Sequence, residues 1–304
     1  MNGTLRILIG IALVVIGICA LIWPGSLPGR PTERLDKEWS VTGDELKELQ
    51  VLGDGRVNIA FQESADGSQS VSVKGEVPSK VAKAIEQTRL EGGRLVVDLR
   101  DEHRFFPAFL FSFHWGDPEE VTVKLKPGYE LSRLIVRTDS GQIRAGNITV
   151  KTAEFSSDAA ELKLADITGG QIRVRTDSGS LEMANVAADM LDIRMDSGGI
   201  QGNGITADTT IRLDSGNANL DGVNGRFSIR ADSGHIRLIK KDTADADIRV
   251  DSGDVYVRLP ASFAGTLDLK SASGRIDAPE TKNETQDRIQ IQTDSGKIEV
   301  ELEE

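Results

Sequence analysis

The sequence predicts an all-β protein, a β-solenoid or β-helix of stacked 18–22-residue coils with an N-terminal β-rich cap and a single N-terminal transmembrane helix. Three observations predict this fold. The triplet Asp-Ser-Gly occurs seven times between residues 139 and 296, apolar and polar residues alternate on both sides of it, and one uncharged apolar segment lies near the amino terminus. Repeats with a fixed period indicate a fold built by stacking one structural unit.

The apolar segment predicts a membrane anchor over residues 1–23. Ile7 to Trp23 is an uncharged run of 17 residues, which spans about 26 Å as a helix. A cleaved signal peptide needs small residues before the cut, and the sequence up to Trp23 supplies none. Acylation of Cys19 would need a small residue in place of Ile18. We therefore expect an uncleaved signal anchor, followed by a proline-containing stalk over residues 24–40.

The orientation of this anchor depends on few charges. Arg6 precedes the apolar run, whereas Arg30, Arg34 and Lys37 follow it, so a strict count of basic residues favours a cytoplasmic domain. The very short N-terminal tail and the absence of cysteine after Cys19 favour the opposite orientation. We expect a single-pass cell-membrane protein whose C-terminal domain is extracytoplasmic.

Residues 131–304 are predicted to form the solenoid. Nine corners, of which seven read Asp-Ser-Gly, follow one another at intervals of 18–22 residues. The residue three before each corner and the residue four after its start are apolar in all nine repeats, and the residue two before is polar, with six arginines. This period of two places a half-buried strand on each side of every corner. A second corner follows in the early repeats, at Asn147, Asp166, Asn185, Gly204 and Gly222. Stacking explains the recurrence of one side chain at one corner, which an antiparallel meander would not require.

The repeated aspartate and arginine each admit two interpretations. Stacked carboxylates could bind Ca²⁺, or each aspartate could accept a backbone N–H in an Asx turn whose glycine is in the left-handed α region. Because Ala272 replaces the aspartate while Gly274 remains, we expect the turn. The arginines could bind a polyanion or form a solvated face that the aspartates neutralise. Residues 131–304 contain 21 basic and 29 acidic residues, a balance of −8, which favours neutralisation.

Residues 41–130 lack the triplet and are expected to form the N-terminal cap, with strands near 57–61, 71–73 and 94–100 and a helix over 79–90. This region contains an aromatic loop that is the one candidate binding segment. Its members are Phe105, Phe106, Phe109, Phe111, Phe113 and Trp115. Exposed aromatic clusters mark interfaces, so the loop either contacts a partner or the membrane, or folds back over the open end of the solenoid.

Composition and motifs indicate a binding protein rather than an enzyme. The 304 residues carry a net charge of −12, which argues against a nucleic-acid partner, and one cysteine excludes a disulfide framework or a multi-cysteine zinc site. No Gly-x-Ser-x-Gly, phosphate-loop or His-Glu-x-x-His motif occurs. We therefore predict no catalytic, cofactor-binding or metal-binding residues. The alternatives are a polysaccharide-active β-helix enzyme and a cytoplasm-facing scaffold of a membrane complex.

The block from Val121 to Tyr129, continued by residues 134–143, resembles a bacterial putative-adhesin domain-of-unknown-function family, the Asp-Ser-Gly β-strand-repeat envelope proteins that include LiaG-like proteins. A second copy of the block covers residues 255–276. The resemblance implies a non-catalytic, adhesin-like binding or scaffold module of the cell envelope, linked to the envelope-stress response. It also implies an envelope protein or polysaccharide as the partner, with the membrane reached through the N-terminal helix.

Overall fold

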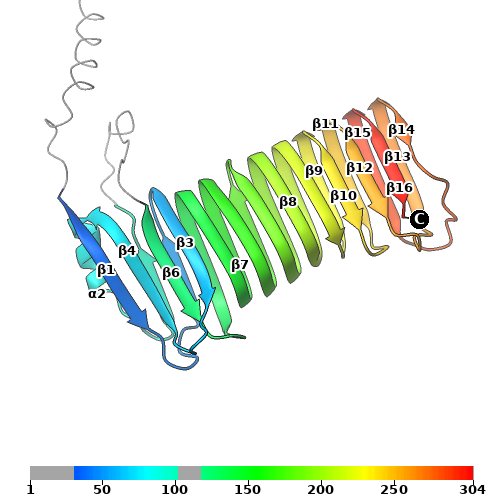
Figure 1. The fold of residues 1–304 in the computed structure, drawn as a ribbon. Coiled ribbons are helices and arrows are strands. Elements are labelled where there is room, and N and C mark those ends of the chain that lie inside the picture. Colours follow the sequence, from blue (N-terminus) through cyan, green and yellow to red (C-terminus); the bar gives the residue numbers. More distant parts are fainter. Residues whose placement is uncertain (1–30, 102–117, 304) are drawn as a thin grey trace, which may run out of the picture. The chain divides into compact units, whose positions relative to one another are not determined.

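The computed structural model describes residues 31–101 and 118–303 (Figure 1). These residues form sixteen strands and one helix, which confirms the all-β prediction. The described residues from Glu33 onward belong to one compact unit. The predicted anchor and the aromatic loop lie outside the described residues. Within the described part of the chain, no helix has the length and apolar character needed to span a membrane.

The coils of the unit contribute strands to two long rows, which we call the first and second faces. Where β7 pairs with β8, a short third segment is also paired, Ile167–Gly169 with Val186–Ala188. The first face contains β5 (Arg94–Asp98), β2 (Glu48–Leu52), the parts of β7 (Glu130–Thr176) and β8 (Ser180–Val223) that precede each corner, β9 (Phe227–Ser233), β11 (Ala246–Ser252), β15 (Arg288–Ser295) and β13 (Thr266–Ser273). The second face contains β1 (Thr32–Ser40), β4 (Ser70–Pro78), β6 (Glu119–Leu125), β3 (Arg56–Glu63), the parts of β7 and β8 that directly follow each corner, β10 (Ile236–Lys240), β12 (Val255–Leu259), β16 (Ile298–Leu302) and β14 (Ile276–Asp277).

The coils stack in parallel and in register, as the solenoid prediction requires. On the first face, Ile248 of β11 is paired with Ile229 of β9 on one side and Ile291 of β15 on the other. The apolar columns point inward and are buried from Val136 to Val255 and again at Ile291 and Ile298, whereas Leu269 is half-buried and Ile276 is exposed. Burying identical apolar positions against one another produces a continuous core along the stack, and this core is the main source of stability of such a fold.

The glycine of each Asp-Ser-Gly corner is required for a different reason from the one predicted. Its φ lies between +112° and +148° at Gly141, Gly179, Gly198, Gly216, Gly234, Gly253 and Gly296, outside the left-handed α region near +60° and in a region open to glycine alone. A Cβ on Gly198 would also lie 2.1 Å from the carbonyl oxygen of Gly179 in the preceding coil. At the glycine positions, the stacked corners therefore leave no room for a side chain.

The second corner is confirmed as a left-handed turn. Asn147, Asp166 and Asn185 have φ of 52–53°, and Gly204 and Gly222 have φ of 65° and 62°. Asparagine and aspartate tolerate this conformation better than other non-glycine residues. Consecutive corners also contact each other, since Asn185 Nδ2 donates to Asp166 Oδ1 at 2.9 Å.

At both ends of the solenoid, the order of coils in space differs from their order in the sequence (Figure 1). At the N-terminal end, β2 lies between β5 and β7, and β3 lies between β6 and β7. At the C-terminal end, β15 lies between β11 and β13, and β16 lies between β12 and β14. At the N-terminal end the inner coil precedes the outer coil in the sequence, whereas at the C-terminal end the outer coil precedes the inner one.

This arrangement changes the interpretation of residues 24–130. Part of the expected cap forms two further parallel coils, and the strand edge of β6 is covered by antiparallel β4, with β1 beyond it. From Thr32 onward, the structure has a strand where a stalk was predicted. This strand, β1, pairs with β4 and buries Leu35 and Trp39. The predicted helix is present as α2 (Ser79–Gln87), and it ends early because Thr88 is extended, with ψ 137°.

Candidate functional site

The second face carries one aromatic side chain among its outward residues near the C-terminal end. Tyr256 of β12 lies between the inward residues Val255 and Val257, so the alternation of the strand turns its ring outward. The other aromatic residues from 131 to 303, which are all described, are Phe155, Phe227 and Phe263, and they are buried. Tyr256 is therefore the aromatic ring that this part of the solenoid presents to a ligand.

Charged groups from three adjacent coils surround this ring. The guanidinium carbons of Arg237 and Arg258 lie 5.4 and 5.7 Å from its centroid, within the range of a cation–π contact. The Tyr256 hydroxyl donates to Glu301 Oε2 at 2.5 Å, and Arg258 Nη2 donates to the same oxygen at 3.1 Å. The register explains this geometry, because Glu301 of β16 is directly opposite Arg258 of β12.

These contacts fix the protonation states of the cluster. The hydrogen bond from Tyr256, followed by that from Arg258, holds the pKa of Glu301 below its usual value. Burial, followed by the hydrogen bond to Glu301, raises the pKa of Tyr256 above its usual value. At neutral pH the cluster thus contains a carboxylate, a neutral phenol and two guanidinium cations.

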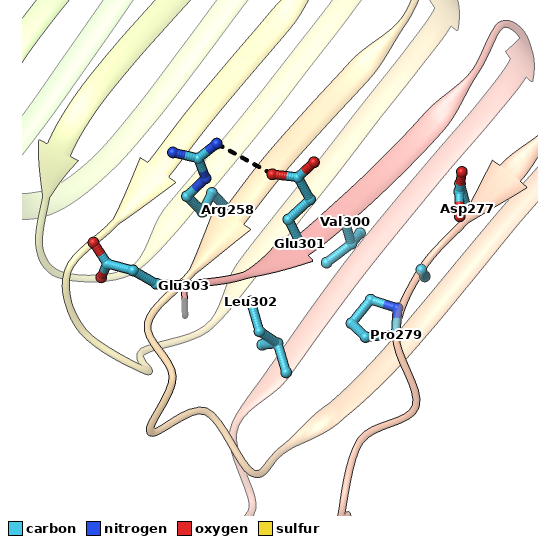
Figure 2. A pocket seen from close by; sticks show the side chains of 8 residues that line it. Arg258, Asp277, Pro279, Val300, Glu301, Leu302 and Glu303 are labelled. Carbon is cyan, nitrogen blue, oxygen red and sulfur yellow. Dashed lines mark hydrogen bonds and ion pairs between the residues drawn. The ribbon is translucent and has the colours of Figure 1, made fainter.

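A cleft of about 590 Å³ opens beside this cluster (Figure 2). Arg258, Val300, Glu301, Leu302 and Glu303 line one side, and Asp277, Ala278 and Pro279 line the other. The cleft exists because β14 pairs with β16 only at residues 276 and 277, whereas β16 continues to residue 302. Pro279 lacks the N–H that would extend the pairing.

The chemistry of this site suits the binding of a neutral polar ligand. Each cleft carboxylate already has a basic partner: Asp277 with Arg275 at 3.3 Å, Glu301 with Arg258 at 3.1 Å, and Glu303 with Lys241 at 3.2 Å. Such pairs offer hydrogen-bond donors and acceptors while adding little net charge. In the described part of the chain, no three His, Cys, Asp or Glu side chains converge as metal ligands.

The arginine column of the first face is neutralised, although not by the predicted residues. Asp192 lies 3.4–3.8 Å from Arg173, Arg194 and Arg212, and Glu154 lies 2.8 Å from Arg137 and 3.8 Å from Arg175. These acids occupy the column two residues before the arginines. The Asp-Ser-Gly aspartates were expected to serve this purpose, but among the described residues the six from Asp177 to Asp294 form none of these ion pairs.

The Asp-Ser-Gly aspartates have a different environment from that predicted. Asp177, Asp196, Asp214, Asp232, Asp251 and Asp294 are exposed. Among the described residues, none of these six carboxylates accepts a hydrogen bond. The predicted Asx turn, in which the carboxylate accepts a backbone N–H, is therefore absent at these corners. The serine instead links the coils, since Ser197 donates its backbone N–H to the carbonyl oxygen of Asp177 at 2.8 Å and its hydroxyl to the same oxygen at 3.3 Å.

One buried cation is explained by packing alone. Lys240 is 1% exposed, and its Nζ donates to the Gly225 carbonyl at 2.6 Å and lies 2.8 Å from Asp242 Oδ1. Burial is the main cause that lowers the pKa of this ammonium, and the hydrogen bond to Asp242 opposes it. Because every contact is internal, Lys240 anchors the end of β10 and does not form a ligand site.

The Tyr256 cluster was not predicted from the sequence. The predicted binding residues, Phe105 to Trp115, lie outside the described residues, so they stay a prediction. A signal for Tyr256 was nevertheless present, because it is an aromatic residue in a repeat column that is otherwise polar or small from Arg144 to Glu299. The proximity of Glu301 could not be inferred, because β16 lies next to β12 only through the exchanged coil order.

Comparison with known proteins places the repeat region in a family. A family model described as Toastrack DUF4097 matches residues 47–303. A solved structure described as a putative adhesin from Bacteroides fragilis is 14% identical, with a TM-score of 0.41, and the match covers 92% of this chain and 100% of that one. A structure described as a putative lipid binding protein from Parabacteroides distasonis is 12% identical, with a TM-score of 0.32, over 88% of this chain and 97% of that one. No curated protein matches the chain. Similarity this distant assigns neither a ligand nor an activity to this chain.

Proposed function

Because the chain belongs to the Toastrack DUF4097 family, we propose that it is a non-catalytic binding or scaffold module of the bacterial cell envelope, anchored by residues 1–23. A stack of parallel coils offers a long surface of repeated polar positions, which is how solenoid proteins bind extended partners. The envelope location is supported by the uncharged run from Ile7 to Trp23. A link to the envelope-stress response belongs to the same proposal.

The observation that carries the proposed binding function is the Tyr256 cluster beside the cleft. A half-buried, outward-facing ring next to paired donors and acceptors matches a polysaccharide, whose apolar ring faces and hydroxyl groups need both kinds of contact. The paired state of Asp277, Glu301 and Glu303 favours a neutral glycan over a strongly charged ligand. We therefore assign the polysaccharide-binding site to this part of the second face.

The protonation of the site supports binding without hydrolysis. Glycoside hydrolases need a protonated carboxyl group whose pKa is raised, opposite a second carboxylate. The hydrogen bonds from Tyr256 and Arg258 instead lower the pKa of Glu301. A carboxylate of this kind accepts hydrogen bonds from a sugar hydroxyl and does not donate a proton to a leaving group.

A binding experiment with the full chain in lipid nanodiscs tests the site. We expect soluble strands of an uncharged polysaccharide, N-acetylglucosamine oligosaccharides, to bind, and the Tyr256→Ala variant to bind about tenfold more weakly because one aromatic contact is lost. Arg230→Ala is the matched control, because Arg230 is exposed on the first face. Equal affinity of the wild type and Tyr256→Ala would show that the ligand does not bind at Tyr256. Shortening of the strands would contradict the non-catalytic proposal.

The predicted topology has its own test. A reporter that is active only outside the cytoplasm, fused after Glu304, is expected to be active in cells. A signal from a cytoplasmic reporter at the same position would favour the cytoplasm-facing scaffold and end the envelope-surface proposal.

A further inference from the structure

The C-terminal end of the solenoid leaves one strand edge open. Among the described residues, β13 pairs with β15 on one side and with no strand on the other. The apolar columns that are buried in the preceding coils are exposed here, since Ile276 is 43% exposed and Leu267 and Leu269 are half-buried. An uncovered parallel edge with apolar residues at its rim is a template for further strand pairing.

The register fixes which backbone groups are free at this edge. The Thr266 N–H donates to the Asp287 carbonyl oxygen at 2.9 Å, so Thr266 points toward β15. Successive residues of a strand direct their N–H and C=O groups to alternate sides. The backbone groups of Leu267, Leu269 and Ser271 therefore point to the open side of β13.

We propose that this edge pairs with the same edge of a second copy of the chain, antiparallel and centred on Leu269. Two-fold symmetry about Leu269 places Asp268 of each copy opposite Lys270 of the other. It also pairs Leu267 with Ser271, so all three residues with free backbone groups form hydrogen bonds across the interface. The result is an isologous dimer in which the two solenoids join end to end.

Charge and burial select a second copy of this chain as the occupant of the edge. A register centred on Leu267 places Asp268 opposite Thr266, and one centred on Ser271 places Lys270 opposite Ala272. Neither register pairs opposite charges. The register centred on Leu269 places Asp268 opposite Lys270 of the other copy at non-hydrogen-bonded positions, where side chains of paired strands are closest. Within its own chain, Asp268 lies 3.2 Å from Lys270 and also pairs with Arg288, so the contact extends an existing ion-pair network across the interface. The same pairing stacks Leu269 on Leu269 of the other copy and so closes the end of both cores.

Disulfide crosslinking of the full chain tests the register. In a Cys19→Ser background, which removes the one native cysteine, we expect Leu269→Cys to form a disulfide-linked dimer under mild oxidation. The two Cα atoms at position 269 are expected about 5.5 Å apart, within disulfide range. Leu267→Cys is the matched control, because its two copies are about 14 Å apart in this register and cannot be bridged.

Mass measurement in nanodiscs, one chain per disc, tests the same interface without cysteine. We expect the wild type to pair, Lys270→Asp to reduce pairing about tenfold or more by placing like charges opposite each other, and Asp268→Lys combined with Lys270→Asp to restore it. A wild type that stays unpaired at micromolar concentration would overturn the proposal, as would equal crosslinking at positions 267 and 269. Pairing that needs a lysate component would identify a different occupant and also overturn it.

Discussion

A single residue type, the glycine of the repeated triplet, determines how closely the coils approach. At Gly198 two constraints coincide: φ is +127°, and a Cβ would lie 2.1 Å from the Gly179 carbonyl oxygen. Either constraint disfavours a side chain, and the second involves backbone, which cannot rotate away. The neighbouring Gly199 meets neither, since its Cβ would have no atom within 4 Å.

We therefore predict that Gly198→Ala lowers the free energy of unfolding by about 3 kcal/mol, the sum of backbone strain and displacement of the adjacent coil. Gly199→Ala should change it by less than about 0.5 kcal/mol or raise it slightly. Urea denaturation of the two variants gives the comparison. Equal losses would mean that glycine flexibility in general, rather than the stacked corner, explains the repeat.

For single residues, the sequence pattern was sufficient to predict burial but not hydrogen bonding. Alternation correctly predicted the buried columns from Val136 to Val255, because burial follows directly from period and polarity, but it did not predict the exposure of Ile276 in the coil at the end of the stack. The environment of Asp214 was predicted incorrectly, since an Asx turn depends on the local backbone path and not on residue type alone. The hydrogen bond from Ser197 to the previous coil was not anticipated, because it joins residues of two coils.

The aspartates of the first face differ in the number of ion pairs that they form with neighbouring arginines. Asp192 has 18% of its side chain exposed and lies within 4 Å of three arginines. Asp214, at the corner of the next coil, is exposed and has no ion pair among the described residues. Two aspartates on adjacent coils therefore contribute differently to the stability of the same sheet.

From this difference we predict that Asp192→Asn costs about 1–2 kcal/mol of unfolding free energy, because the three arginines lose their shared counter-charge. Asp214→Asn should lie within about 0.5 kcal/mol of the wild type. Chemical denaturation at low and at high salt measures both. A larger loss for Asp214→Asn would show that the corner aspartates stabilise the fold after all, as a bound cation would require.

At the element scale, the candidate site could be predicted only in part. Tyr256 and Arg258 are two residues apart on one strand, so their common face follows from the sequence. Glu301 is distant in sequence. Its strand, β16, lies beside β12 only because a whole coil, residues 266–277, is displaced outward. Repeat spacing predicts that coils stack, but it contains no information about the order in which they stack.

The whole molecule offers a physical reason for the exchanged order at the C-terminal end. β12 presents five residues for pairing, Val255 to Leu259, and β16 covers all of them. β14 contributes two paired residues before Pro279 ends the strand. The longer coil therefore buries more of the core when it is placed inside, and the shorter coil loses less by being at the end.

This order predicts an unusual response to truncation. A chain ending at Thr281 lacks β15 and β16, and these are the strand partners of β13 and β14. We expect hydrogen-exchange protection to be lost in residues 266–277 as well, although they remain in the chain. The matched variant replaces residues 260–287 with Lys241–Asp245, the five-residue link between β10 and β11, and should keep residues 288–302 protected, because β15 already pairs with β11 and β16 with β12. Protection of residues 266–277 in the truncated chain would mean that β13 and β14 can cover β11 and β12, so the order of coils would reflect chain connectivity rather than the length of strand each coil offers.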